Sequence, residues 1–235
     1  MGAHPHGWWI LLHLLLFVFW LGGDLGVFYS SRFVIDPARP PAARAAALGI
    51  MSGLDLAPKI CLVLFLPSGI TLMALEPHGA RAFGIDLFPW WSVALVWVIA
   101  AIWLALTIHA HRTHGRVRAT YLGDLVLRVT VLVGMAAAGI YTLIVAEPFG
   151  VTTDPKWLGA KISLYSLAVA AGLGIRMTLR PFGSAFAALQ TEGSTPAIEH
   201  IIKRSVDGCL PYVWTIWGSV LAAAALGVFK PGADL

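Results

Sequence analysis

Six segments of this chain are each long and apolar enough to cross a lipid bilayer. About 20 consecutive apolar residues span the hydrocarbon, and the sequence is 58% hydrophobic and only 12% charged. A soluble domain of this size carries roughly 25% charged residues, so the outside of this chain must be apolar as well. We therefore predict an all-α, polytopic transmembrane bundle in a single domain over residues 1–235. Its six spans are expected near residues 8–32, 56–76, 89–111, 122–146, 157–179 and 209–229.

Two of the connections between these spans are long enough to hold helices of their own. Residues 36–53 follow a Pro-rich turn and predict a short surface helix before the second span. Residues 180–205 predict one or two interfacial helices. Ser194 or Thr195 followed by Pro196 is typical of a helix start.

Basic residues follow a regular pattern along the chain and predict its orientation. The first, third and fifth connections are basic, whereas the second and fourth are nearly neutral, so the odd connections are expected in the cytoplasm. Both termini would then face the periplasm or exterior of a bacterial inner membrane. The net charge of +4 reflects these loops rather than a nucleic-acid partner. The basic residues are Arg32, Arg39, Arg44, Arg112, Arg116, Arg118, Arg180, Lys203 and Arg204.

The ends of the second and fourth spans resemble each other. Residues 66–79 read LPSGITLMALEPHG and residues 136–150 read AAAGIYTLIVAEPFG, and each precedes a Pro-Trp or Pro-Lys-Trp start. This pattern indicates a duplicated helical hairpin. Residues that differ between the copies are informative, and Lys161 is one, because its counterpart in the third span is apolar.

The first span carries a histidine, His13, which is costly in a membrane. Ionisable groups inside a membrane helix cost about 2–3 kcal/mol each, so they usually face a cavity, a cofactor or a partner. His13 follows Trp8 by five residues and Lys161 follows Trp157 by four, which places both about 6–7.5 Å inside the same boundary. An imidazole and an uncharged lysine amine can both ligate haem iron. Alternatively, His13 hydrogen-bonds to another helix, and Lys161 extends to the headgroups.

Helical spacing places further residues beside this pair. The face of the first span with His13 also carries Phe17, Trp20 and Asp24, and the face of the fifth span carries Lys161, Tyr165, Ala168, Gly172 and Arg176. The small residues leave room for a flat ring, and they equally permit close packing of helices.

Three more residues are candidates for roles around a haem. His78, near the exterior end of the second span, is an alternative second ligand to Lys161. Arg128 is expected to form a buried ion pair with Asp24, because an unpaired charge at that depth is costly. Alternatively, Arg128 or Arg176 binds the haem propionates.

With these residues in view, the chain resembles the HemJ-type protoporphyrinogen oxidases and the related CopD-like integral membrane proteins. The first helix of that group reads His, Trp-x-Gly, Phe-Tyr, Arg, which here are His13, Trp20 with Gly22, Phe28-Tyr29 and Arg32. A later Trp-x-x-x-Lys matches Trp157 and Lys161. The resemblance covers two helices, and it implies that His13 and Lys161 are associated with haem.

The sequence favours a b-type haem protein that passes electrons to or from a quinone or a reactive oxygen species near the exterior face. We expect His13 as one iron ligand, Lys161 or His78 as the other, and a homodimer. One alternative is a HemJ-like enzyme that oxidises protoporphyrinogen. Another is a CopD-like copper-handling protein with His4, His6 and His78 at an exterior metal entry.

Overall fold

The computed structural model describes residues 5–75, 88–148 and 155–232, and every regular element in these ranges is a helix. Six of the helices are long and apolar enough to cross a membrane, which confirms the predicted fold class. The spans are α1 (Pro5–Val34), α2 (Pro41–Leu75), α4 (Trp90–Arg112), α5 (Arg118–Ile144), α6 (Lys156–Thr178) and α9 (Leu210–Phe229), and the two shorter helices are α7 (Phe182–Glu192) and α8 (Pro196–Asp207).

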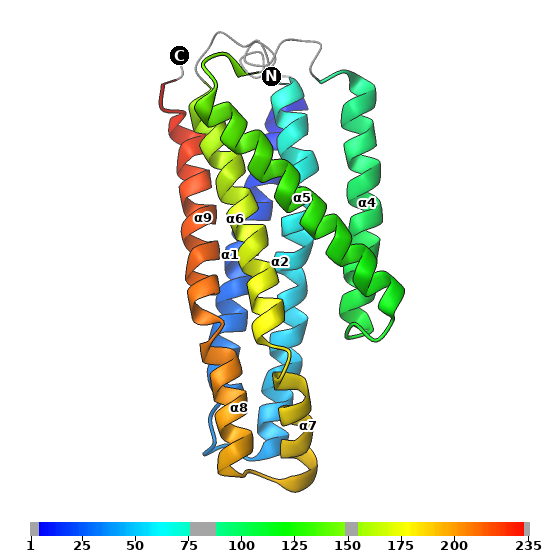
Figure 1. Cartoon of the computed structure of the whole chain (residues 1–235), viewed down its shortest axis with the longest axis vertical. Coiled ribbons are helices and arrows are strands. Elements are labelled where there is room, and N and C mark those ends of the chain that lie inside the picture. Colours follow the sequence, from blue (N-terminus) through cyan, green and yellow to red (C-terminus); the bar gives the residue numbers. More distant parts are fainter. Residues whose placement is uncertain (1–4, 76–87, 149–154, 233–235) are drawn as a thin grey trace.

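The spans associate as neighbouring pairs (Figure 1). Helices α1 and α2 pack closely along their length, as do α6 and α9, and α5 packs on α6. The α1/α2 pair approaches the α6/α9 pair at few backbone positions, so side chains fill most of the distance between the pairs. Helix α5 runs obliquely across the bundle, and α4 lies to one side (Figure 1). The first residues of α1 and the last of α9 lie at one end of the bundle, and α7 and α8 lie at the other.

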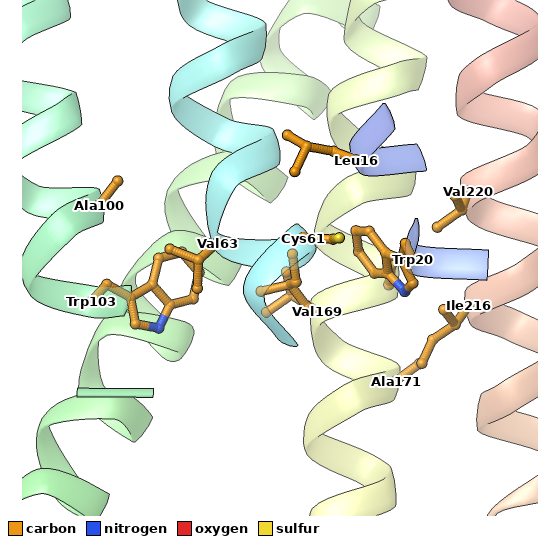
Figure 2. Close-up of a cluster of buried hydrophobic side chains, with 12 residues drawn as sticks. Leu16, Trp20, Cys61, Val63, Ala100, Trp103, Val169, Ala171, Ile216 and Val220 are labelled. Carbon is orange, nitrogen blue, oxygen red and sulfur yellow. The ribbon is translucent and has the colours of Figure 1, made fainter. Parts of the chain in front are cut away.

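The main core forms where five of the spans meet. Trp20 from α1 and Trp103 from α4 are 3% and 1% exposed, respectively. Figure 2 shows their indoles with Cys61 and Val63 of α2 and smaller side chains of α6 and α9. Many large apolar side chains on the outer surfaces remain exposed, Trp90 and Ile144 among them. An apolar core inside an apolar exterior suits a chain that crosses a bilayer several times.

Helix α2 differs from the predicted arrangement, because no break separates the expected surface helix from the second span. It runs unbroken for 35 residues with Pro58 and Pro67 inside it, a length of about 52 Å. Proline removes one backbone hydrogen bond and bends a helix. Both rings are buried against neighbouring helices, where packing compensates for that loss.

The additional length of α2 supports a second core at the α7/α8 end. Phe186, Leu189 and Ile202 pack there against Val34 at the end of α1. The guanidinium of Arg44, fully buried, donates to both carboxylate oxygens of Glu199 at 2.6 and 2.9 Å.

The segment predicted to hold one or two short helices contains two. Helix α8 begins at Pro196, and the Thr195 hydroxyl accepts a hydrogen bond from the Ile198 amide, as the predicted helix start requires. Both α7 and α8 cover the ends of α1 and α2, with which they share the second core.

Candidate functional site

His13 on α1 is oriented by a hydrogen bond to α2. Its Nδ1 lies 2.8 Å from Ser68 Oγ. The Ser68 hydroxyl also lies 2.7 Å from the Leu64 carbonyl, to which it can donate. When it does so, its oxygen accepts from His13 Nδ1, and Nε2 carries the lone pair. A hydrogen bond at one imidazole nitrogen that frees the other is the usual arrangement of a metal-binding histidine.

Besides Ser68, Phe65 and Gly69 of α2 lie next to the imidazole. Phe65 meets the His13 ring edge-on, with the ring centroids 4.6 Å apart. A Cβ on Gly69 would lie 3.6 Å from His13 Cε1. Any side chain larger than alanine at position 69 would therefore fill the space beside the ring.

Lys161 on α6 lies within electrostatic range of His13, as the counts from Trp8 and Trp157 predicted. Its Nζ lies directly against α9, where a Cβ on Gly227 would come within 2.6 Å of it. The structure therefore brings together residues from the α1/α2 and α6/α9 pairs. We call His13, Ser68 and Lys161 the histidine site.

The predicted aromatic residues belong to the main core, which also contains Phe65, the ring beside His13. Trp20 meets Phe65 edge-on at 5.4 Å between centroids, and Phe17 packs on the main core. The Tyr165 hydroxyl donates to the Leu62 carbonyl of α2 at 2.7 Å. This bond links α6 to α2 across the region where the helix pairs have few backbone contacts.

The predicted ion pair between Asp24 and Arg128 is wrong. Arg128 Nε instead donates to both oxygens of Asp124, one turn earlier on α5, at 3.1 and 3.0 Å. The neighbour one turn away on the same helix is closer than any residue at the same depth on α1. Asp24 lies beside the indoles of Trp20 and Trp217 and within electrostatic range of Asp55.

Asp124 is the functional candidate that the sequence reasoning missed. It is fully buried, and it also accepts a hydrogen bond from Arg176 Nη2 at 2.7 Å. We call Asp124, Arg128 and Arg176 the arginine cluster. A carboxylate and an arginine four residues apart in an apolar helix was the available signal.

Of the other histidines, the structure places only those in residues 5–75, 88–148 and 155–232. His78 lies outside the described residues, so the choice between it and Lys161 as second ligand stays a prediction. His111 is near Lys59, with 3.4 Å between Nδ1 and Nζ. No cluster of three or more His, Cys, Asp or Glu side chains occurs in residues 5–75, 88–148 and 155–232. A haem needs only one or two axial ligands, so it does not depend on such a cluster, whereas a zinc or copper site does.

Comparison of the chain with protein-family models, with curated proteins and with solved structures finds no match. The class that fold and composition define is a multi-pass, all-helical membrane protein. Any more specific function depends on the chemistry of the histidine site and the arginine cluster.

Proposed function

We propose that this protein binds haem b between the α1/α2 and α6/α9 pairs, with His13 Nε2 as an axial ligand, and that it transfers electrons. The observation that carries the proposal is the hydrogen bond between His13 Nδ1 and Ser68 Oγ, which orients the imidazole inside a membrane bundle and leaves Nε2 for a ligand. A histidine at this depth costs free energy, and residues of this kind in membrane spans usually have a function.

The residues present fit a haem in three respects. His13 supplies an oriented imidazole, and Lys161 supplies a second nitrogen from the opposite helix pair, with His78 as the alternative. The two helix pairs have few backbone contacts with each other. A porphyrin ring between them would therefore displace side chains, and the backbone could stay in place. Phe65, Phe17 and Trp20 provide the apolar and aromatic walls that a porphyrin prefers.

When bound, haem supplies one-electron chemistry through its iron. The protein residues hold and tune it: Ser68 fixes the His13 ring, and the surrounding helices exclude water. His13 lies near the start of α1, and α1 begins at the end of the bundle where α9 ends (Figure 1). We propose that this end faces the periplasm of a bacterial inner membrane, because the basic connections lie at the other end. A quinone or reactive oxygen species would react there, and the protein would function as a homodimer.

The test is an absorption spectrum of the detergent-purified protein, oxidised and reduced, for the wild type and for His13→Ala. The wild type should show the Soret and α bands of a b-type haem, and His13→Ala should lose them or shift them strongly. His200→Ala is the matched control, because His200 is exposed on α8, and its spectrum should equal that of the wild type.

Other outcomes would contradict the proposal. An unchanged spectrum and haem content in His13→Ala would show that His13 is not a ligand. A colourless wild type, produced with ample haem and containing copper by elemental analysis, would favour the CopD-like alternative. Rescue of a strain that lacks protoporphyrinogen oxidase would favour the HemJ-like enzyme.

A further inference from the structure

The arginine cluster carries one more positive charge than negative charge inside the bundle. Asp124 is its only carboxylate and is saturated by hydrogen bonds from Trp103 Nε1 (3.2 Å), Thr107 Oγ1 (2.8 Å), Arg128 and Arg176. The two guanidinium groups bind the same oxygen, Oδ2, at 3.0 and 2.7 Å. Two cations therefore converge on one anion, which leaves a net charge of about +1 in a medium where uncompensated charge is costly.

Two donors of the cluster are unsatisfied. Arg128 Nη2 and Arg176 Nη1 are buried and have no hydrogen-bond partner within the part of the chain that the structure describes. A buried orphan donor in a native protein usually indicates a missing ligand, ion or water. The Arg128 side chain is only 7% exposed, whereas that of Arg176 is 25% exposed. The cluster is thus closed on the side of Arg128 and accessible on the side of Arg176.

Aromatic rings and apolar surface surround the cluster. The Arg176 guanidinium lies 5.0 Å from the Tyr121 ring centroid, and that of Arg128 lies 5.8 Å from the ring of Trp103. Asp124 follows the start of α5 by six residues, which is about 9 Å of helix. On the face of α5 that carries Asp124, Leu127 and Val131 are partly buried against the main core. A ligand at the cluster would therefore have its polar end among the arginines and its apolar part against these side chains.

We propose that Arg128 and Arg176 bind an oxyanion, a carboxylate or phosphate, carried by an amphiphilic molecule within the membrane. Guanidinium groups present paired donors that match the oxygens of both anions. A singly charged oxyanion would neutralise the cluster and satisfy both orphan donors. Its source is either an anionic phospholipid or a propionate of haem. Only the second source rests on the proposed function.

The first arm of the test measures phospholipid binding to the full-length chain in detergent by native mass spectrometry. Phosphatidylglycerol, which has one net negative charge, should bind the wild type more tightly than zwitterionic phosphatidylcholine does. Arg176→Gln should weaken phosphatidylglycerol binding about tenfold or more, because it removes a charge-assisted contact. Arg176→Lys should weaken it less. Arg180→Gln, which removes an exposed charge just beyond α6, should leave it unchanged.

The second arm measures haem binding with the same variants and with haem dimethyl ester, whose carboxylates are blocked. If a propionate is the ligand, wild-type protein should bind the ester about tenfold more weakly than haem, and Arg176→Gln should show no such difference. This comparison uses the wild type, so it remains informative even where Arg176→Gln fails to fold.

The two arms separate the failure of this proposal from the failure of the proposed function. A wild type that binds no haem but shows Arg176-dependent phosphatidylglycerol binding would overturn the haem assignment and support the oxyanion site. The oxyanion site is refuted if neither the wild type nor Arg176→Lys discriminates within either ligand pair. The first pair is phosphatidylglycerol and phosphatidylcholine, and the second is haem and its dimethyl ester.

Discussion

The histidine site and the arginine cluster both bury polar groups inside the bundle, yet they differ in charge and in how completely their hydrogen bonds are satisfied. In the histidine site, His13 of α1 and Ser68 of α2 share a hydrogen bond within electrostatic range of Lys161 of α6, and one imidazole nitrogen is left for a ligand. In the arginine cluster, three charged side chains from α5 and α6 converge, and two donors have no acceptor. The first arrangement suits coordination of a metal, and the second suits recognition of an anion.

The difference in charge between the two sites also predicts which of them contributes more to the free energy of unfolding. An oriented neutral hydrogen bond contributes about 1 kcal/mol. A buried charge that loses its partner costs about 3–5 kcal/mol. Asp124 links α4, α5 and α6, so the arginine cluster is expected to dominate stability and the histidine site to dominate cofactor chemistry.

The largest effect is expected from Asp124→Asn, which leaves two arginines in the bundle without a counter-charge. The free energy of unfolding should fall by about 3–5 kcal/mol, measured by thermal or denaturant unfolding in detergent. Asp207→Asn is the matched control. It removes the partner of Lys203 and Arg32 in solvent-accessible pairs at the α8 end, so it should change stability by less than about 1 kcal/mol. Equal stability of the two variants would show that Asp124 does not compensate the arginines.

The two regions also differ in how well the sequence predicted them. His13 and Lys161 were placed at one depth by counting residues from interfacial tryptophans, and the structure brings them within electrostatic range. Such counting works because a helix has a fixed rise per residue. The partner of Arg128 was predicted wrongly, because depth alone does not say which face of a helix a residue occupies relative to its neighbours. That depends on the crossing of α4, α5 and α6, which no single segment encodes.

The continuity of α2 shows the same limit of local reasoning. The composition of residues 41–75 favours helix almost throughout, whereas Pro58 and Pro67 argue locally for breaks. Both prolines are buried in the bundle, and tertiary packing outweighs their local cost. The six spans themselves were predictable, because the membrane requires long apolar segments that satisfy their own backbone hydrogen bonds.

An intermediate effect is expected from Ser68→Ala, which removes the hydrogen-bond partner of His13 Nδ1. The loss of that partner should lower the free energy of unfolding by about 1–3 kcal/mol. If His13 ligates haem, haem affinity should also fall by about 10–100-fold, as for other residues that orient metal ligands. Haem retention during gel filtration and unfolding in detergent measure the two effects. Ser184→Ala, at an exposed serine of α7, should change neither, and haem retention equal to wild type in Ser68→Ala would argue against ligation by His13.

The smallest effect is expected at Gly172 on α6, which lies on the same helix face as both Tyr165 and Arg176 and between them. A Cβ at Gly172 would have no neighbour within 4 Å, whereas a Cβ at Gly139 on α5 would lie 2.9 Å from the Gly159 carbonyl oxygen and the Ser163 amide nitrogen. The two interpretations of small residues in these helices therefore apply to different glycines: Gly139 allows close packing of α5 on α6, and Gly172 leaves open space.

Gly172→Ala should therefore raise the free energy of unfolding by at most about 0.5–1 kcal/mol, since alanine favours helix over glycine. Gly139→Ala should lower it by about 1–3 kcal/mol through overpacking. The sharper variant is Gly172→Leu. If an amphiphile or a haem occupies the space between the histidine site and the arginine cluster, leucine should displace it and lower its content while the protein stays folded. Ligand content equal to that of the wild type in Gly172→Leu would place the two regions in separate environments, each with its own ligand.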